Sequence, residues 1–126
     1  MSNLRSDTKN SGFTLVEVLV AMVILSIGLL GMASLTVGII HANKFSNDLT
    51  TATTLAQDKM EDIRRTSYAS VTPEAKAALP SDYAQYKREV KVDDNNPATG
   101  MKTVRVKVYW GASDAHSVEL KTILAQ

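Results

Sequence analysis

Hydrophobic and polar positions divide the chain into segments of different periodicity. Residues 13–40 form a 28-residue apolar run in which Glu17 is the only charged residue. As an α-helix this run extends about 42 Å, which exceeds a hydrocarbon core of about 30 Å. A secretory signal peptide has a shorter apolar region that ends in a small-residue cleavage site, and no such site follows residue 40. The run therefore predicts a membrane-spanning helix.

The helical pattern continues after the apolar run but becomes one-sided. Residues 41–66 contain neither proline nor glycine, and apolar side chains recur there at spacings of three or four. This stripe consists of Phe45, Leu49, Ala52, Ala56, Met60 and Ile63, and the opposite side is polar, including Asp48 and Arg64. We predict one helix over residues 13–66, with its second half amphipathic and packed on the domain that follows. Threonines at 50–54 weaken helix propensity, which would allow a bend there.

The last third of the chain changes to a period of two. Alternating apolar residues predict three antiparallel strands, the first starting near Tyr83, the second over 104–110 and the third over 118–124. Turn-forming residues at 93–100 and 111–116 predict the connections between them. Residues 74–79, between Pro73 and Pro80, are expected to form one or two helical turns. The fold class is therefore α+β, with a long helix on a three- to four-stranded antiparallel sheet and a head domain at 67–126.

Composition narrows the functional classes. A chain of 126 residues supports one domain, and its net charge of +1 lacks the basic excess of a nucleic-acid-binding protein. There is no cysteine, so disulfides and thiolate metal sites are excluded. His41 and His116 offer no metal-ligand spacing, and the acidic turn at 93–96 lacks the ligand pattern of a calcium loop. We predict no catalytic residue, no cofactor and no metal, and therefore no enzyme. The aromatic residues of the head are assigned to sheet packing rather than to a binding surface.

The residues before and inside the apolar run suggest how it is used. Arg5 and Lys9 precede the run, which predicts a cytoplasmic N-terminus. A charged side chain at the centre of a membrane costs about 2.5–3.5 kcal/mol, and less near the edge. Glu17 lies one turn into the run, where it either extends to the interface and benefits from the helix dipole or awaits a cationic partner. Both interpretations are open from the residues alone.

The segment around Glu17 resembles the class III signal of type IV pilins and pseudopilins. The matching string is Gly12-Phe13-Thr14-Leu15-Val16-Glu17-Val18-Leu19-Val20-Ala21, preceded by a short polar leader. The resemblance implies the pilin fold. It also implies that a prepilin peptidase cleaves between Gly12 and Phe13, removes the leader 1–12 and methylates the new amine of Phe13. Glu17 would then pair with the amine of a neighbouring subunit during filament assembly.

Two further stretches refine the resemblance. Residues 20–35 and 52–61 are similar to minor pilins of the type IV pilus modification (PilV-type) group, and the second stretch is shared by minor type II secretion pseudopilins. The span lacks the proline that major pilins commonly have, and Ser34 stands in its place. This implies a minor pilin that helps to initiate or cap the pilus. The implied partners are other minor pilins, the major pilin, prepilin peptidase and the inner-membrane assembly platform, and no nucleic acid is expected.

Three alternatives predict different fates for the N-terminus. A minor pseudopilin of a type II secretion system shares the fold and the processing. A bitopic membrane protein with a small ligand- or partner-binding outer domain retains the leader and does not need Glu17. A secreted β-domain with an unusual signal requires that residues 13–40 be absent from the mature form. The favoured interpretation places the protein in the bacterial inner membrane first and in the periplasm or a surface pilus afterwards.

Overall fold

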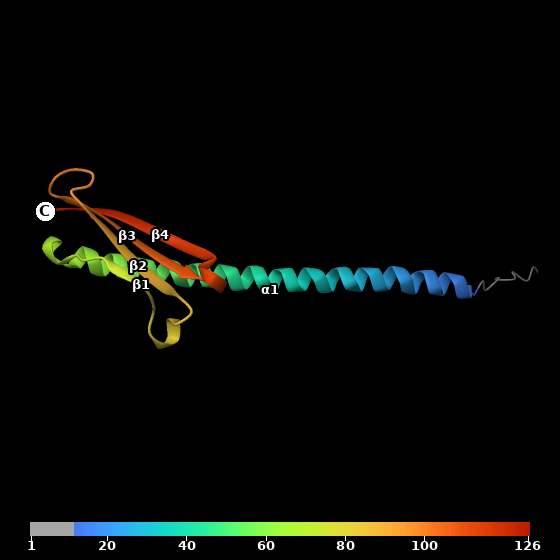
Figure 1. Ribbon diagram of the computed structural model, residues 1–126. Coiled ribbons are helices and arrows are strands. Elements are labelled where there is room, and N and C mark those ends of the chain that lie inside the picture. Colours follow the sequence, from blue (N-terminus) through green and yellow to red (C-terminus); the bar gives the residue numbers. More distant parts are fainter. Residues whose placement is uncertain (1–11) are drawn as a thin grey trace, which may run out of the picture. The chain divides into compact units, whose positions relative to one another are not determined.

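The computed structural model describes residues 12–126. The expected leader up to residue 11, with Arg5 and Lys9, lies outside the described residues. The chain divides into two compact units, one ending at His41 and the other spanning Ala42–Gln126. Helix α1 (Leu15–Arg65) forms the described helical part of the first unit and the beginning of the second (Figure 1).

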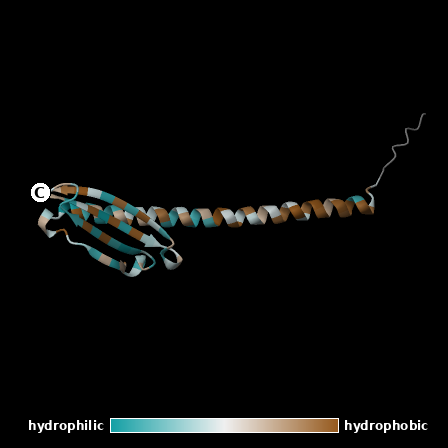
Figure 2. Ribbon diagram, turned by 45° about the horizontal axis from the view of Figure 1, so that its top comes forward, coloured by the Kyte–Doolittle hydropathy of each residue, from teal (hydrophilic) through white to brown (hydrophobic). Residues whose placement is uncertain are grey.

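The first unit presents an apolar surface on all sides of α1. Its large apolar side chains are exposed, from Phe13 at 83% to Ile40 at 61%, and apolar residues predominate along this part of the helix (Figure 2). By length and composition, α1 is able to cross a membrane. The hydroxyls of Ser26, Ser34 and Thr36 each donate to the backbone carbonyl four residues earlier. These polar groups are therefore satisfied within the helix itself, as lipid requires.

The second unit is α+β, as predicted, because the amphipathic part of α1 packs on an antiparallel sheet. The sheet has four strands in the order β1-β2-β3-β4. They are β1 (Glu74–Ala78), β2 (Lys87–Asp94), β3 (Met101–Trp110) and β4 (His116–Ala125) (Figure 1). Each strand pairs with the next along the chain, so the sheet is a simple meander. Short 3₁₀ turns lie in the connections.

The core forms where the helical stripe meets the sheet. Ala52 and Ala56 are fully buried, and their small side chains let α1 approach the strands closely. The opposing side chains come mainly from β2 and β3, namely Val90, Val104, Val106, Val108 and Trp110. Phe45 and Leu49, at the start of the predicted stripe, remain 45% and 38% exposed. The stripe therefore enters the core only from Ala52 onward.

Two sequence predictions in the head are wrong. Residues 74–79 do not form helical turns, because Glu74–Ala78 is strand β1, whose Ala77 pairs with Arg88 of β2. So short a segment cannot nucleate a stable helix, whereas pairing with β2 satisfies its backbone. The strand expected from Tyr83 begins instead at Lys87, because Ser81–Tyr83 is a 3₁₀ turn.

Two residues on the polar side of α1 also contact the head. Asp48 accepts a hydrogen bond from the Tyr86 hydroxyl at 3.3 Å, and Arg64 donates to the Thr122 hydroxyl at 3.4 Å. No break occurs at the threonines of 50–54, where α1 is continuous. The hydroxyls of Thr50, Thr53 and Thr54 bond to carbonyls four residues earlier instead of unwinding the helix.

Candidate functional site

One threonine, Thr14, caps the start of α1. Gly12, Phe13 and Thr14 precede the helix, and Leu15 is its first residue. The backbone N–H of Glu17 donates to the Thr14 hydroxyl at 3.2 Å, and the N–H of Val18 donates to the Thr14 carbonyl at 3.2 Å. Thr14 is therefore the N-cap, and it satisfies an amide that the first turn would otherwise leave free.

Glu17 occupies the third helical position, where a capping box places glutamate or glutamine. In a complete box its side chain returns to the backbone N–H of the cap residue. Among the hydrogen bonds and ion pairs of residues 12–126, none is accepted by the Glu17 carboxylate, and the residue is exposed. The cap thus uses the backbone of Glu17, while its carboxylate has no partner within residues 12–126.

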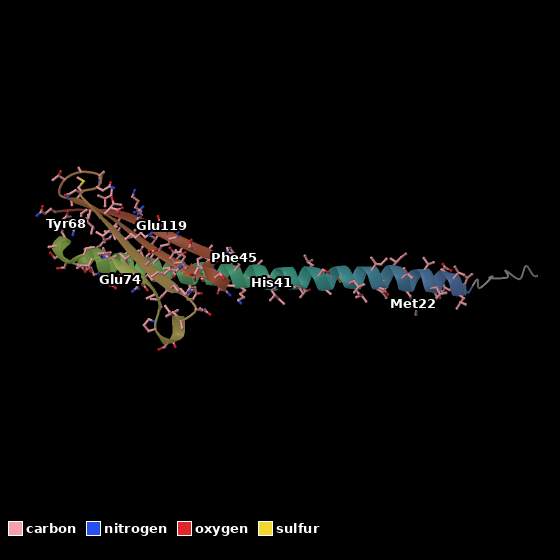
Figure 3. The ribbon with its side chains drawn as sticks, viewed as in Figure 1. Met22, His41, Phe45, Tyr68, Glu74 and Glu119 are labelled. Atoms are coloured by element: carbon pink, nitrogen blue, oxygen red, sulfur yellow. The ribbon has the colours of Figure 1, made fainter. Side chains whose placement is uncertain are left out.

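The surroundings of this carboxylate are apolar. A shallow groove runs along one face of the helix and is lined by Phe13, Glu17, Val18, Ala21, Met22 and Leu25. The i, i+4 spacing of Phe13, Glu17 and Ala21 places them on one face, and the Met22 side chain projects from the helix surface nearby (Figure 3). Glu17 is the single charge on this apolar surface, so a cation bound there would meet a carboxylate in a weakly polar environment.

Several charged groups in the head pair with one another. The Glu74 carboxylate of β1 forms ion pairs with Lys59 of α1 and Arg88 of β2. Glu74 lies where the sheet meets α1 (Figure 3). Asp114 receives Lys76 and Lys87, whose contacts hold the pKa of its carboxyl below the ordinary value. The Tyr109 hydroxyl donates to Glu89 at 2.8 Å. These contacts resemble a structural network more than a reactive site.

The other residues considered in the sequence have packing positions. Tyr86 and Trp110 are 2% and 4% exposed, in agreement with sheet packing, while Tyr83 is 44% exposed. His116 lies against Phe45 with ring centroids 5.2 Å apart. Within the described residues, no group of three or more His, Cys, Asp or Glu is arranged to hold a metal ion.

Comparison with known families identifies the N-terminal segment. Residues 7–33 match the family model of the prokaryotic N-terminal methylation motif. The match covers 27 of 126 residues, so it characterises this segment and not the head. No curated protein and no solved structure matched the chain.

The methylation motif coincides with the geometry described above. It contains Gly12, Phe13, the Thr14 cap and Glu17, and it extends over the first part of the exposed apolar helix. Together, the motif and the helix fit anchoring in an inner membrane and support a function like that of type IV pilins or pseudopilins. The sequence analysis singled out Gly12, Phe13 and Glu17, but it did not predict that Thr14 caps the helix. The signal was the Thr-x-x-Glu spacing of a capping box.

Proposed function

We propose that the protein is a minor pilin, a structural subunit that helps to initiate or cap a type IV pilus. The methylation motif over residues 7–33, followed by an exposed apolar helix, carries this proposal. In it, prepilin peptidase cleaves between Gly12 and Phe13 and methylates the amine of Phe13. The chain is held in the inner membrane with its N-terminus in the cytoplasm until it enters the pilus.

Glu17 supplies the assembly contact in this proposal. Its carboxylate has no partner among the described residues and lies in an apolar groove. Cleavage creates a positively charged amine on Phe13 of each subunit. Opposite charges within about 4 Å attract strongly in a medium of low dielectric constant. The Phe13 amine of a neighbouring subunit is therefore the partner that this groove fits best.

A role as a minor pilin rather than as the major filament subunit is supported by the apolar run, because it lacks the proline that major pilins commonly have there. Residues 13–40 contain no proline, and α1 continues from Leu15 to Arg65 as one helix. The proposed partners are other minor pilins, the major pilin and the inner-membrane assembly platform.

Intact-mass measurement of the membrane-extracted protein tests the processing step. We expect the mass of the chain beginning at Phe13 plus one methyl group. Gly12→Val is the matched control, because a bulky residue at the cleavage site should leave the leader attached. Wild-type protein that begins at Met1 would contradict the proposal and favour a bitopic membrane protein with a binding domain.

A further inference from the structure

The two edges of the sheet differ in how open they are. Strand β1 has five residues and a register shift between Glu74 and Ala77. A proline lies near each of its ends, at positions 73 and 80. Short strands, irregular pairing and proline are the usual protection of a sheet edge. Strand β4, drawn in red in Figure 1, has ten residues that pair with β3 without a shift. It contains neither proline nor glycine. Its outer edge therefore lacks this protection.

The direction of the backbone groups follows from one hydrogen bond. Just after β4, the N–H of Gln126 donates to the carbonyl of Gly100 at 3.0 Å. In an antiparallel pair, alternate residues point their N–H and C=O groups at the partner strand. The even-numbered residues of β4 therefore bond to β3. The odd-numbered ones, including Ser117, Glu119, Lys121 and Ile123, face the outer edge, where no described strand pairs with them.

A groove lies beside this edge, between β4 and α1. It is lined by Gln57, Met60, Glu61, Arg64, Arg65, Leu120 and Lys121. Met60 and Leu120 give it an apolar floor. The inward-facing side chains of β4 are only half-buried, including Val118, Leu120 and Leu124. An added strand would therefore find apolar contact for every second side chain.

The charge of the groove is positive. Arg64, Arg65 and Lys121 line it with a single acid, Glu61, which pairs with Arg65. Among the described residues, the one hydrogen bond of the Arg64 side chain is to the neutral hydroxyl of Thr122, and Lys121 has no ion pair. The nearest acid along β4, Glu119, lies opposite Lys107 of β3. Two cations are thus left without a carboxylate, which favours an acidic partner.

We propose that the outer edge of β4 binds an extended acidic segment of a different protein chain. The segment adds as a fifth, antiparallel strand, with apolar side chains on the α1 face over Met60 and Leu120 and acidic side chains on the opposite face near Lys121. Backbone hydrogen bonds supply affinity and the alternating side chains supply specificity. A second copy is disfavoured because pairing two β4 edges would bring the same uncompensated cations, Arg64 and Lys121, to both sides of the contact. The inference goes beyond the proposed function and rests on the head alone, independently of leader cleavage or filament assembly.

Binding of a defined peptide tests this inference. The probe is an acetylated, amidated peptide of the length of β4 that alternates valine and glutamate, added to the full chain in detergent micelles. We expect it to slow hydrogen exchange at the outward amides, such as those of Glu119 and Lys121. A valine–lysine peptide of equal length should bind about tenfold more weakly. No protection in β4, or equal binding of both peptides, would overturn the proposal.

Two variants of Lys121 separate the contribution of its backbone N–H to peptide binding from that of its side-chain charge. Lys121→Pro removes an outward N–H that β3 does not use, so the sheet tolerates it while the added strand is blocked. Lys121→Glu keeps the N–H and should weaken acidic-peptide binding about tenfold. If Lys121→Pro fails to fold, the binding of the acidic peptide to Lys121→Glu tests the proposal instead. Lys91→Glu changes an exposed charge on β2 and should leave binding unchanged. Peptide-free self-association that Lys121→Pro abolishes would assign the edge to a second copy instead.

Discussion

Thr14 and Glu17 are polar residues at the start of α1, and their side chains differ in whether they find a hydrogen-bond partner. The Thr14 hydroxyl accepts the Glu17 amide and so completes the helix start within one chain. The Glu17 carboxylate receives no such bond among the described residues. A charged group transferred out of water costs several kcal/mol unless it is paired. In the proposed function, the cation that pairs with Glu17 comes from a neighbouring subunit.

Replacing Glu17 by alanine tests this pairing. We expect Glu17→Ala to be cleaved normally, because the bond between Gly12 and Phe13 is unchanged, but to be incorporated poorly into filaments. The measurement is the ratio of the protein in sheared filaments to that in membranes. Asp58→Ala removes an exposed carboxylate elsewhere on α1 and serves as the control. Wild-type incorporation of Glu17→Ala would mean that its carboxylate has no assembly role.

Tyr109 predicts a stability change at alkaline pH. Burial, together with the hydrogen bond to Glu89, raises the pKa of Tyr109 to about 12. The folded chain thus holds this proton to higher pH than the unfolded chain, so the free energy of unfolding falls as pH rises from about 10 to about 12. Tyr109→Phe should reduce that fall, measured by urea unfolding across this range. Tyr83→Phe, at an exposed position, should retain it, and an identical decline in both variants would refute the assignment.

At the scale of elements, the two fully buried alanines of α1 set its distance from the sheet. Ala56→Leu places extra methylenes against the core valines and should lower the free energy of unfolding by about 1–3 kcal/mol. Ala42→Leu, at an exposed position on the same helix, should have little effect. Urea unfolding of the full chain in detergent, followed by fluorescence of the buried Trp110, measures both. Equal midpoints would show that the helix does not pack closely at Ala56.

Strand prediction succeeded where side chains alternate and failed where they do not. The valines of β3 face the core at every second position, and this pattern was readable. Strand β1, with the sequence Glu-Ala-Lys-Ala-Ala, consists of residues that favour helices. Its state is decided by pairing with β2, a contact that local propensity does not contain. Pro80 was an available signal, since the residue before a proline avoids the helical conformation.

The N-terminal methylation motif was recognisable in the sequence because its residues are neighbours along the chain. Gly12, Phe13 and Glu17 lie within six positions of one another. The contacts of the head were not readable, since Asp48 and Tyr86 are 38 residues apart. The open edge of β4 could not be predicted either, because it depends on the order and register of the strands, and no single segment of the sequence determines these.

At the scale of the whole head, one acidic residue joins helix and sheet. Glu74 of β1 contacts Lys59 of α1 and Arg88 of β2. Burial alone would raise the pKa of Glu74, but the two cations outweigh it and the pKa lies below the ordinary value. The unfolded chain therefore takes up this proton at higher pH than the folded chain does.

Acid should consequently loosen the head. The contribution of Glu74 is present above the ordinary pKa range of glutamate and is lost as pH falls through the lowered pKa. We expect Glu74→Gln to reduce, but not abolish, the difference between urea midpoints at neutral pH and at about pH 3. Part remains because the pKa of Glu89 and of Asp114 is also lowered. Asp58→Asn, at an exposed position with no ion pair among the described residues, is the control. An unchanged difference in Glu74→Gln would exclude Glu74 as a source of acid sensitivity.

The self-bonded hydroxyls of the apolar helix have a consequence for its transfer. Ser26, Ser34 and Thr36 carry their acceptors with them, so exchanging lipid tails for protein neighbours breaks none of these bonds. Such a helix can leave a bilayer without finding substitutes for lost solvation at these positions. In the proposed function, Glu17 then distinguishes the membrane from the filament, because only the filament brings a neighbouring amine to its carboxylate.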